Sequence, residues 1–245
     1  MERSNVALMI AAWNSLSGRW VVSIAASLIY SCVCALVFII PYVGLFIYLA
    51  ICGPLLLGLT HFYLHVQRAK TVNIGDVWIG YRSWGLATRV HLLRMLYLMV
   101  WLLTILIPIL MVVFAHENYR CLLRYKVVWL VGFVLFLPFV RALLCYSMTF
   151  FIVADHPWLS PFAAISRSAS MMKGNVLKLA ALFAMFIVLI FAPSTLVLLI
   201  VYHLKLSMLL ASVITWSTLL FSFSCLLPWM NVTMAHFYES VKGDM

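Results

Sequence analysis

The histidines are the first residues of this chain whose spacing suggests chemistry. His61 and His65 are four residues apart, so they would share one face of a helix, and His236 opens a second copy of the triplet His-Phe-Tyr. Three imidazoles with Glu239 nearby are a ligand set that zinc accepts. The alternative is a duplicated structural unit, in which the two triplets occupy equivalent positions. The spacing leaves both interpretations open.

Arg141 lies near the middle of the apolar stretch Val127–Val153, three residues after Pro138. An arginine at the centre of a bilayer costs roughly 2.5–3.5 kcal/mol on insertion scales, so it should face a partner, a cavity or water. No acidic residue lies within any apolar stretch of the chain. A structural role against carbonyls freed by the proline, a lipid phosphate, an anionic substrate and another subunit are the alternatives. Asn231 lies three residues after Pro228, and the two polar residues are predicted to face a shared polar interior.

The sequence Asp155-His156-Pro157 pairs two residues that are common in acid–base sites. A turn explains it better, because proline ends the preceding helix and Ser160 is a good cap for the next one. Asp155 would then face lipid headgroups, and Asp76 is likewise interpreted as a helix cap. The chain has no phosphate-binding glycine loop, zinc-protease helix or nucleophile elbow. We therefore expect a non-catalytic protein without a cofactor.

The elements that position these residues follow from composition. Hydrophobic residues make up 67% of the 245 residues and charged residues only 9%, against about 25% charged in soluble domains. Six continuous apolar stretches are each long enough to cross a bilayer as a helix. The sequence therefore predicts an all-α membrane protein with six transmembrane helices: Trp20–Ile40, Val43–Tyr63, Leu92–Phe114, Val127–Val153, Val176–Tyr202 and Met208–Met230.

The distribution of lysine and arginine predicts the orientation. With the amino terminus inside, eleven basic residues, Arg94 among them, fall in cytoplasmic segments. The outer segments hold four: Arg120, Arg124, Lys126 and Lys205. By the positive-inside rule both termini are cytoplasmic, and a bacterial inner membrane is the expected location. The net charge of +10 fits anionic lipid headgroups as partners, and nucleic acid is not an expected partner.

Three shorter amphipathic segments are predicted to lie in the membrane interface before the odd-numbered spans. They are Ser4–Ser17, Asp76–Ala87 and a helix that starts at Pro161 and ends at Lys173. A glycine near the end of each is expected to turn the chain into its span: Gly18, Gly85 and Gly174.

The order of surface helix, span, turn and span occurs three times, which predicts repeated helix-hairpin units over residues 4–68, 73–154 and 158–243 of one polytopic domain. Aromatic residues close the even-numbered spans. In this interpretation they are interfacial anchors at headgroup depth: Phe62, Tyr63, Phe237 and Tyr238.

Several short motifs resemble a bacterial integral membrane family catalogued as domain of unknown function 975. Their order and spacing, rather than any one of them, carry the resemblance over nearly the whole chain. At His156 the chain departs from the family pattern, where asparagine is usual. The resemblance implies a polytopic cytoplasmic-membrane protein and no particular reaction. The motifs are Gly53–Gly58 with Phe62, Tyr63 and Arg68; Asp76, Gly80 and Tyr81; Ala154–Pro157; Ala164, Ile165, Ser168 and Met171–Gly174; and Pro228 with Phe237 and Tyr238.

Two functions of different classes fit these features. One is a scaffold or an accessory subunit for transport or envelope processes, with a membrane-protein partner or a second copy of the chain. The other is a small-molecule or lipid transporter with a midplane site at Arg141, which proline-kinked hairpins suit. A dry helix contact around Arg141 would favour the first function, and a cavity open to one side would favour the second.

Overall fold

A computed structural model describes residues 4–41, 43–115, 122–204 and 207–242 of the chain. These residues are helical with short connections, and they contain no strand. In chain order the helices are α1 (Asn5–Leu16), α2 (Trp20–Ile39), α3 (Gly44–Gln67), the 3₁₀ helix η1 (Ile74–Ser83), α4 (Trp84–Ala115), α5 (Leu122–Cys145), α6 (Thr149–Asp155), α7 (Pro161–Met171), α8 (Val176–His203) and α9 (Met208–Lys242).

The prediction of six transmembrane helices is confirmed. Six segments of the described chain are long and apolar enough to cross a membrane, and each overlaps one of the predicted stretches. The third differs most, since it runs from Ile74 to Leu103 and the prediction was Leu92–Phe114. Their outer surfaces are apolar, with Val21 and Met208 exposed among many other large side chains. A water-soluble protein could not present so much apolar surface, so the chain is a multi-pass membrane protein.

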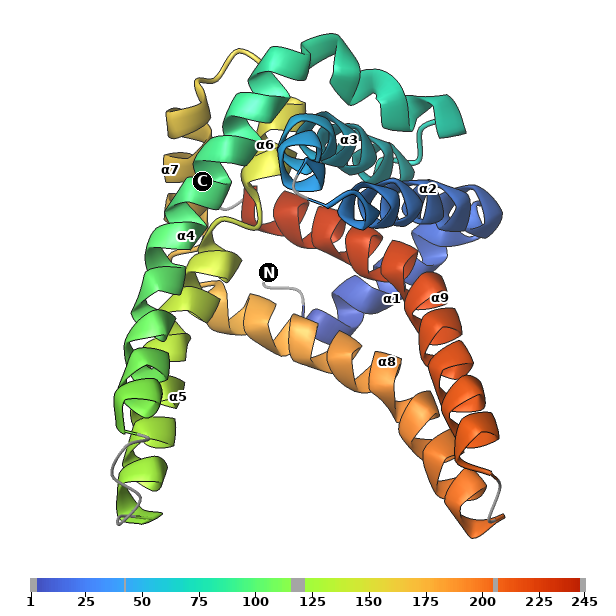
Figure 1. Cartoon of the computed structure of the whole chain (residues 1–245). Coiled ribbons are helices and arrows are strands. Elements are labelled where there is room, and N and C mark those ends of the chain that lie inside the picture. The colour runs from blue at the N-terminus through green and yellow to red at the C-terminus, as the bar shows by residue number, and fades with distance from the viewer. Residues whose placement is uncertain (1–3, 42, 116–121, 205–206, 243–245) are drawn as a thin grey trace.

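The long helices are arranged as three hairpins, α2–α3, α4–α5 and α8–α9. Figure 1 shows the α4–α5 and α8–α9 hairpins diverging like two legs from a common region that contains α3, α6 and the last part of α9. We call this region the hub. The helices α1, η1 and α7 lie around it. The α4–α5 and α8–α9 hairpins therefore come closest to each other near the hub.

Two of the predicted surface helices, α1 and α7, form as expected. Each has a serine cap: Ser4 Oγ accepts a hydrogen bond from the Ala7 amide, and Ser160 Oγ accepts one from the Ala163 amide, both at 3.2 Å. Gly18 and Gly174 follow these helices with φ of +74° and +85°. Only glycine adopts this conformation without strain, so both glycines turn the chain into the next span.

The second surface segment differs from its prediction. It is a 3₁₀ helix, η1, that continues without a turn into α4, so Gly85 lies in the first turn of α4. Asp76 is not the cap residue, because Asn73 occupies that position. The Asp76 carboxylate instead accepts a hydrogen bond from the Asn73 amide at 3.0 Å, as the fourth residue of a capping box does.

The fourth span is broken, whereas the sequence predicted one continuous helix. A turn at Tyr146–Met148 separates α5 from α6. Side-chain hydroxyls satisfy the carbonyls at this break: Ser168 Oγ of α7 donates to the Cys145 carbonyl and Ser147 Oγ donates to the Leu144 carbonyl, both at 2.7 Å. The polar side chains that allow a break inside a membrane protein come partly from a distant segment, which periodicity cannot reveal.

The four aromatic residues predicted as interfacial anchors are buried instead, so that interpretation was wrong. Phe62, Tyr63, Phe237 and Tyr238 are each at most 1% exposed. The Tyr63 hydroxyl donates to the Ser23 carbonyl at 3.2 Å and also contacts Ser27 Oγ. Because the second and sixth spans meet at the hub, their ends pack against protein rather than against headgroups.

Small residues in α3 allow η1 and α4 to cross it at close range. A Cβ on Gly53 would lie 2.8 Å from the Cβ of His91 and 3.0 Å from the Ala87 carbonyl oxygen. A Cβ on Gly58 or Gly80 would collide with the backbone of Val77 or Pro54, respectively. The glycines of the Gly-Pro-Leu-Leu-Leu-Gly motif therefore explain why η1 can lie directly on α3.

Replacement of Gly80 by alanine should destabilise the protein, because the new methyl group meets backbone atoms that cannot move independently. We expect a loss of about 3 kcal/mol in the free energy of unfolding, in the upper range for overpacking, measured by thermal or denaturant unfolding in detergent. Gly75→Ala is the matched control on the same 3₁₀ helix, since nothing lies within 4 Å of its Cβ position. Equal stability of the two variants would contradict the close crossing.

Candidate functional site

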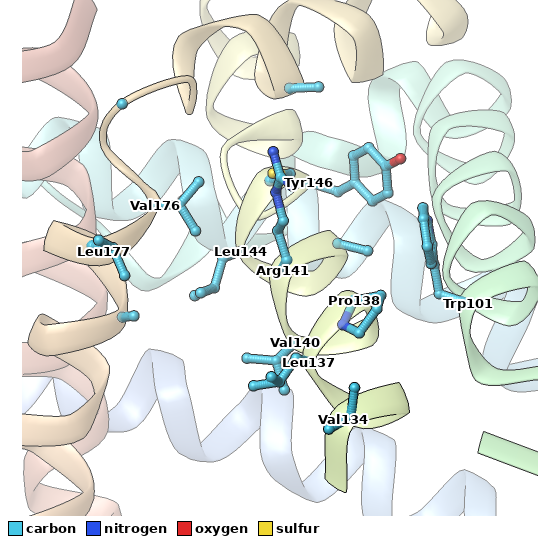
Figure 2. A pocket seen from close by; sticks show the side chains of 15 residues that line it. Trp101, Val134, Leu137, Pro138, Val140, Arg141, Leu144, Tyr146, Val176 and Leu177 are labelled. Carbon is cyan, nitrogen blue, oxygen red and sulfur yellow. The ribbon is translucent and has the colours of Figure 1, made fainter. Parts of the chain in front are cut away.

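Arg141 lies one turn before the end of α5, not in the middle of a continuous span, because the helix ends at Cys145. Its side chain is exposed. Figure 2 shows it extending along α5 in the direction of Tyr146, the first residue of the break. Within the described part of the chain no hydrogen bond or ion pair involves its guanidinium. The charge of Arg141 is therefore available to a group outside the described residues.

The Arg141 cavity has a volume of about 950 Å³ and lies beside α5, between this helix and the start of α8. α5 supplies most of its lining, Trp101 of α4 and Ala169 of α7 contribute, and Val176, Leu177 and Ala180 of α8 form another wall. Leu177 is 83% exposed, and Val134 and Leu137 are more than half exposed, so the cavity opens laterally. Its size is within the range of ligand-binding pockets.

The lining of the Arg141 cavity is apolar except at one end. Arg141 is the only charged residue among the lining residues, and none of them is acidic. The Tyr146 side chain lies at the same end of the cavity as the Arg141 guanidinium (Figure 2). Val134 and Leu137 continue the apolar lining along α5, away from the guanidinium. One charged end and a long apolar remainder form an amphipathic cavity with a single positive charge.

Asn231 does not share this cavity, so the predicted pairing with Arg141 is not formed. It lines a separate pocket of about 120 Å³, which we call the hub pocket, together with Arg94, Tyr63 and Ser147. The count of basic residues had assigned Arg94 to a cytoplasmic segment. The structure places it in α4, within a segment that can cross the membrane. The sequence could have indicated this location, because Arg94 lies two residues inside the predicted span Leu92–Phe114.

The three histidines of the predicted metal site do not come together as ligands. The rings of His61 and His65 are close, with centroids 4.2 Å apart, but His236 Nε2 is hydrogen-bonded to Ser15 Oγ of α1 at 2.9 Å. Among the described residues no group of three or more histidine, cysteine or acidic side chains could hold a metal ion. Glu239, the expected fourth ligand, belongs to an ionic cluster.

This ionic cluster joins the hub ends of α3, α6 and α9. Arg68 donates two parallel hydrogen bonds to the Asp155 carboxylate, both at 2.8 Å, and its Nε donates to Glu239 at 2.8 Å. Lys242 Nζ donates to Asp155 at 2.7 Å, and the Tyr238 hydroxyl donates to the same carboxylate at 3.1 Å. Asp155, expected to face headgroups, is instead the centre of a buried network, with 8% of its side chain exposed.

The members of the ionic cluster are regularly spaced in sequence. Arg68 and Asp155 are 87 residues apart, and so are Asp155 and Lys242. Three copies of one helix-hairpin unit would produce this spacing, although the repeat itself stays a prediction. The hydrogen bonds to Asp155 and then to Glu239 raise the pKa of Arg68, so its charge is permanent.

No family model, curated protein or solved structure matches this chain. The resemblance to domain of unknown function 975 therefore stays a prediction from the motifs. What the chain does has to be argued from the Arg141 cavity, the hub pocket and the ionic cluster themselves.

Replacement of Asp155 by asparagine should loosen the hub, because Arg68 and Lys242 would lose their common counter-charge. Removing one partner of a buried ion pair costs about 3 kcal/mol or more, and we expect a loss of that order in detergent unfolding. Glu239→Gln is the graded comparison. Its side chain is 29% exposed, so water can replace part of its interaction and the expected loss is about 1 kcal/mol. Similar losses in the two variants would refute a central role for Asp155.

Proposed function

We propose that this multi-pass membrane protein binds an anionic lipid in the Arg141 cavity and that lipid handling is its function. The phosphate would lie against the guanidinium of Arg141, and an acyl chain would follow the apolar surface along α5 and α8. The observation that carries this proposal is the unpaired arginine at one end of a lateral apolar cavity of about 950 Å³.

The chemistry of the cavity matches an anionic amphiphile better than a water-soluble anion. A guanidinium binds phosphate oxygens through two parallel hydrogen bonds, but a soluble anion would leave the rest of the apolar lining exposed. A neutral apolar ligand would leave the charge of Arg141 without a counter-ion. A lipid with a phosphate headgroup satisfies both parts of the cavity, and its chains enter sideways from the bilayer.

The Arg141 cavity supports the scaffold function less well than it supports lipid binding. A scaffold would use Arg141 in a dry contact between helices, whereas the side chain is exposed at a cavity that opens laterally. A protein partner that covers this face of α5 and α8 would occupy the same cavity. The two functions are thus distinguished by what is bound there when the protein leaves its membrane.

The predicted orientation indicates which leaflet would supply the lipid. With both termini in the cytoplasm of a bacterium, the hub and α7 lie at the inner leaflet, and the guanidinium of Arg141 is directed toward that side. Exposed Lys173 of the α7–α8 turn lies at the same end. The cytoplasmic leaflet carries anionic headgroups, so the cavity would take its lipid from the inner leaflet.

Reporter fusions test this orientation. A fluorescent protein fused after Met245 should fold and fluoresce, because it would remain in the cytoplasm. Alkaline phosphatase fused at the same position should be inactive, since it needs an oxidising compartment to form its disulfides. Fusions between α8 and α9 are the control and should give the opposite pattern. Phosphatase activity at the carboxyl terminus would refute the proposed orientation.

Native mass spectrometry of protein extracted gently from its own membrane tests the lipid proposal. The parent should retain one anionic phospholipid. Arg141→Ala should bind it about tenfold more weakly, because a charge-assisted hydrogen bond worth about 1.5 kcal/mol is lost, so its lipid-bound fraction should be lower at every lipid concentration. Ala180→Trp should have a similar effect by filling the cavity while leaving the charge in place.

The matched control is Arg82→Ala, which removes an exposed arginine of η1 that does not line the Arg141 cavity. It should retain the lipid as the parent does. Equal lipid retention in the parent and in Arg141→Ala would overturn the proposal. A stoichiometric protein partner without bound lipid would support the scaffold function instead.

A further inference from the structure

The hub pocket is a second, smaller cavity, to which all three hairpins contribute. It has a volume of about 120 Å³ and is lined from α3, α4, α6, α8 and α9 and from the break between α5 and α6. Most of its lining is apolar or aromatic. Its polar side chains are Thr60, Tyr63, Arg94, Ser147 and Asn231.

Arg94 brings a positive charge to this pocket without a counter-charge. Its Nε is shielded from solvent and has no hydrogen-bond partner, and no ion pair within the described residues includes it. The protein contact of its guanidinium is the Phe150 ring, 4.9 Å from Cζ. Arg94 is half-buried, and a cation–π contact compensates only part of the cost of removing its charge from water. An anion in the pocket would compensate the rest.

The carboxylates of the described chain are used elsewhere. Asp155 and Glu239 are bound in the ionic cluster with Arg68 and Lys242, and Asp76 accepts a hydrogen bond from the Asn73 amide at the start of η1. The anion therefore has to come from outside the described chain.

The other polar groups of the hub pocket restrict the kind of anion. Thr60 and Ser147 donate their hydroxyl protons to carbonyls of the preceding helical turn, at 2.8 and 2.7 Å. Their oxygens thus offer lone pairs to the pocket. Asn231 donates one amide proton to the Leu227 carbonyl at 3.0 Å, and its side chain is also hydrogen-bonded to Tyr63. A ligand that accepts from Arg94 and also donates to hydroxyl oxygens fits best.

We propose that the hub pocket binds a small, singly charged oxyanion that retains a proton, of the dihydrogen phosphate or hydrogen carbonate type. Two of its oxygens match the guanidinium fork of Arg94, and its own O–H matches the hydroxyl acceptors. A water molecule needs roughly 10–15 Å³ of such space, so the pocket has room for an ion of several atoms. Because the pocket touches all three hairpins, the bound ion would stabilise the hub.

Thermal unfolding of the full chain in detergent, with inorganic phosphate as the probe, tests this site. Ionic strength is held constant with potassium chloride. Phosphate should raise the unfolding temperature of the parent saturably, by about 3 °C at ten times its dissociation constant. Arg94→Gln, which keeps hydrogen-bond donors but removes the charge, should abolish this response. Arg141→Ala should retain it, which separates the hub pocket from the lipid cavity.

Ser147→Ala is a second variant in case Arg94→Gln does not fold. It removes a hydroxyl acceptor of the pocket, so about ten times more phosphate should be needed for the same response. No saturable response of the parent up to 50 mM phosphate would overturn the proposal, taking about 50 mM as the limit of useful weak binding. An equal rise with chloride, or an unchanged response in the two variants, would also overturn it, because the effect would then be one of salt in general.

Discussion

The arrangement of the three hairpins depends on the hydrogen bonds that the Asp155 carboxylate accepts. It receives hydrogen bonds from Arg68 of the first hairpin and from Tyr238 and Lys242 of the third, while it belongs to the second. Apolar packing between membrane helices has little directional preference, because lipid chains are as apolar as leucine. A buried carboxylate with three donors does fix a direction, since each unmade hydrogen bond would leave a charge uncompensated.

Joining the hairpins at the hub has a consequence at their other ends. Helices that are held together at one end diverge toward the other (Figure 1). Both the α4–α5 and the α8–α9 hairpins line the Arg141 cavity, and the bilayer offers the molecules that can occupy it. The break between α5 and α6 contributes as well, because it brings Arg141 to the end of a helix and Ser147 to the hub pocket.

Arg141 and Arg94 show how the same type of side chain can suit different ligands. Arg141 is exposed at an open, mainly apolar cavity, where a lipid phosphate is the proposed counter-ion. Arg94 lies in a small pocket among hydroxyl and amide groups, where a compact oxyanion is proposed. The difference lies in the shape and polarity of the surroundings and not in the charge itself, so each site selects its ligand by size and by the pattern of donors and acceptors.

The sequence by itself determined the elements. Continuous apolar stretches located the six spans, and amphipathic periodicity with a following glycine located α1 and α7, because bilayer thickness and the membrane interface impose local requirements that a linear pattern records. Only the tertiary structure decided what those elements place together. It buried Tyr63 and Tyr238, which alone look like headgroup anchors. Arg94, which the sequence analysis assigned to a cytoplasmic segment, lies in a pocket beside Asn231, and Asp155 lies at the centre of the hub. These outcomes depend on which helix ends meet, and contacts between residues more than 80 positions apart leave no local periodicity to read.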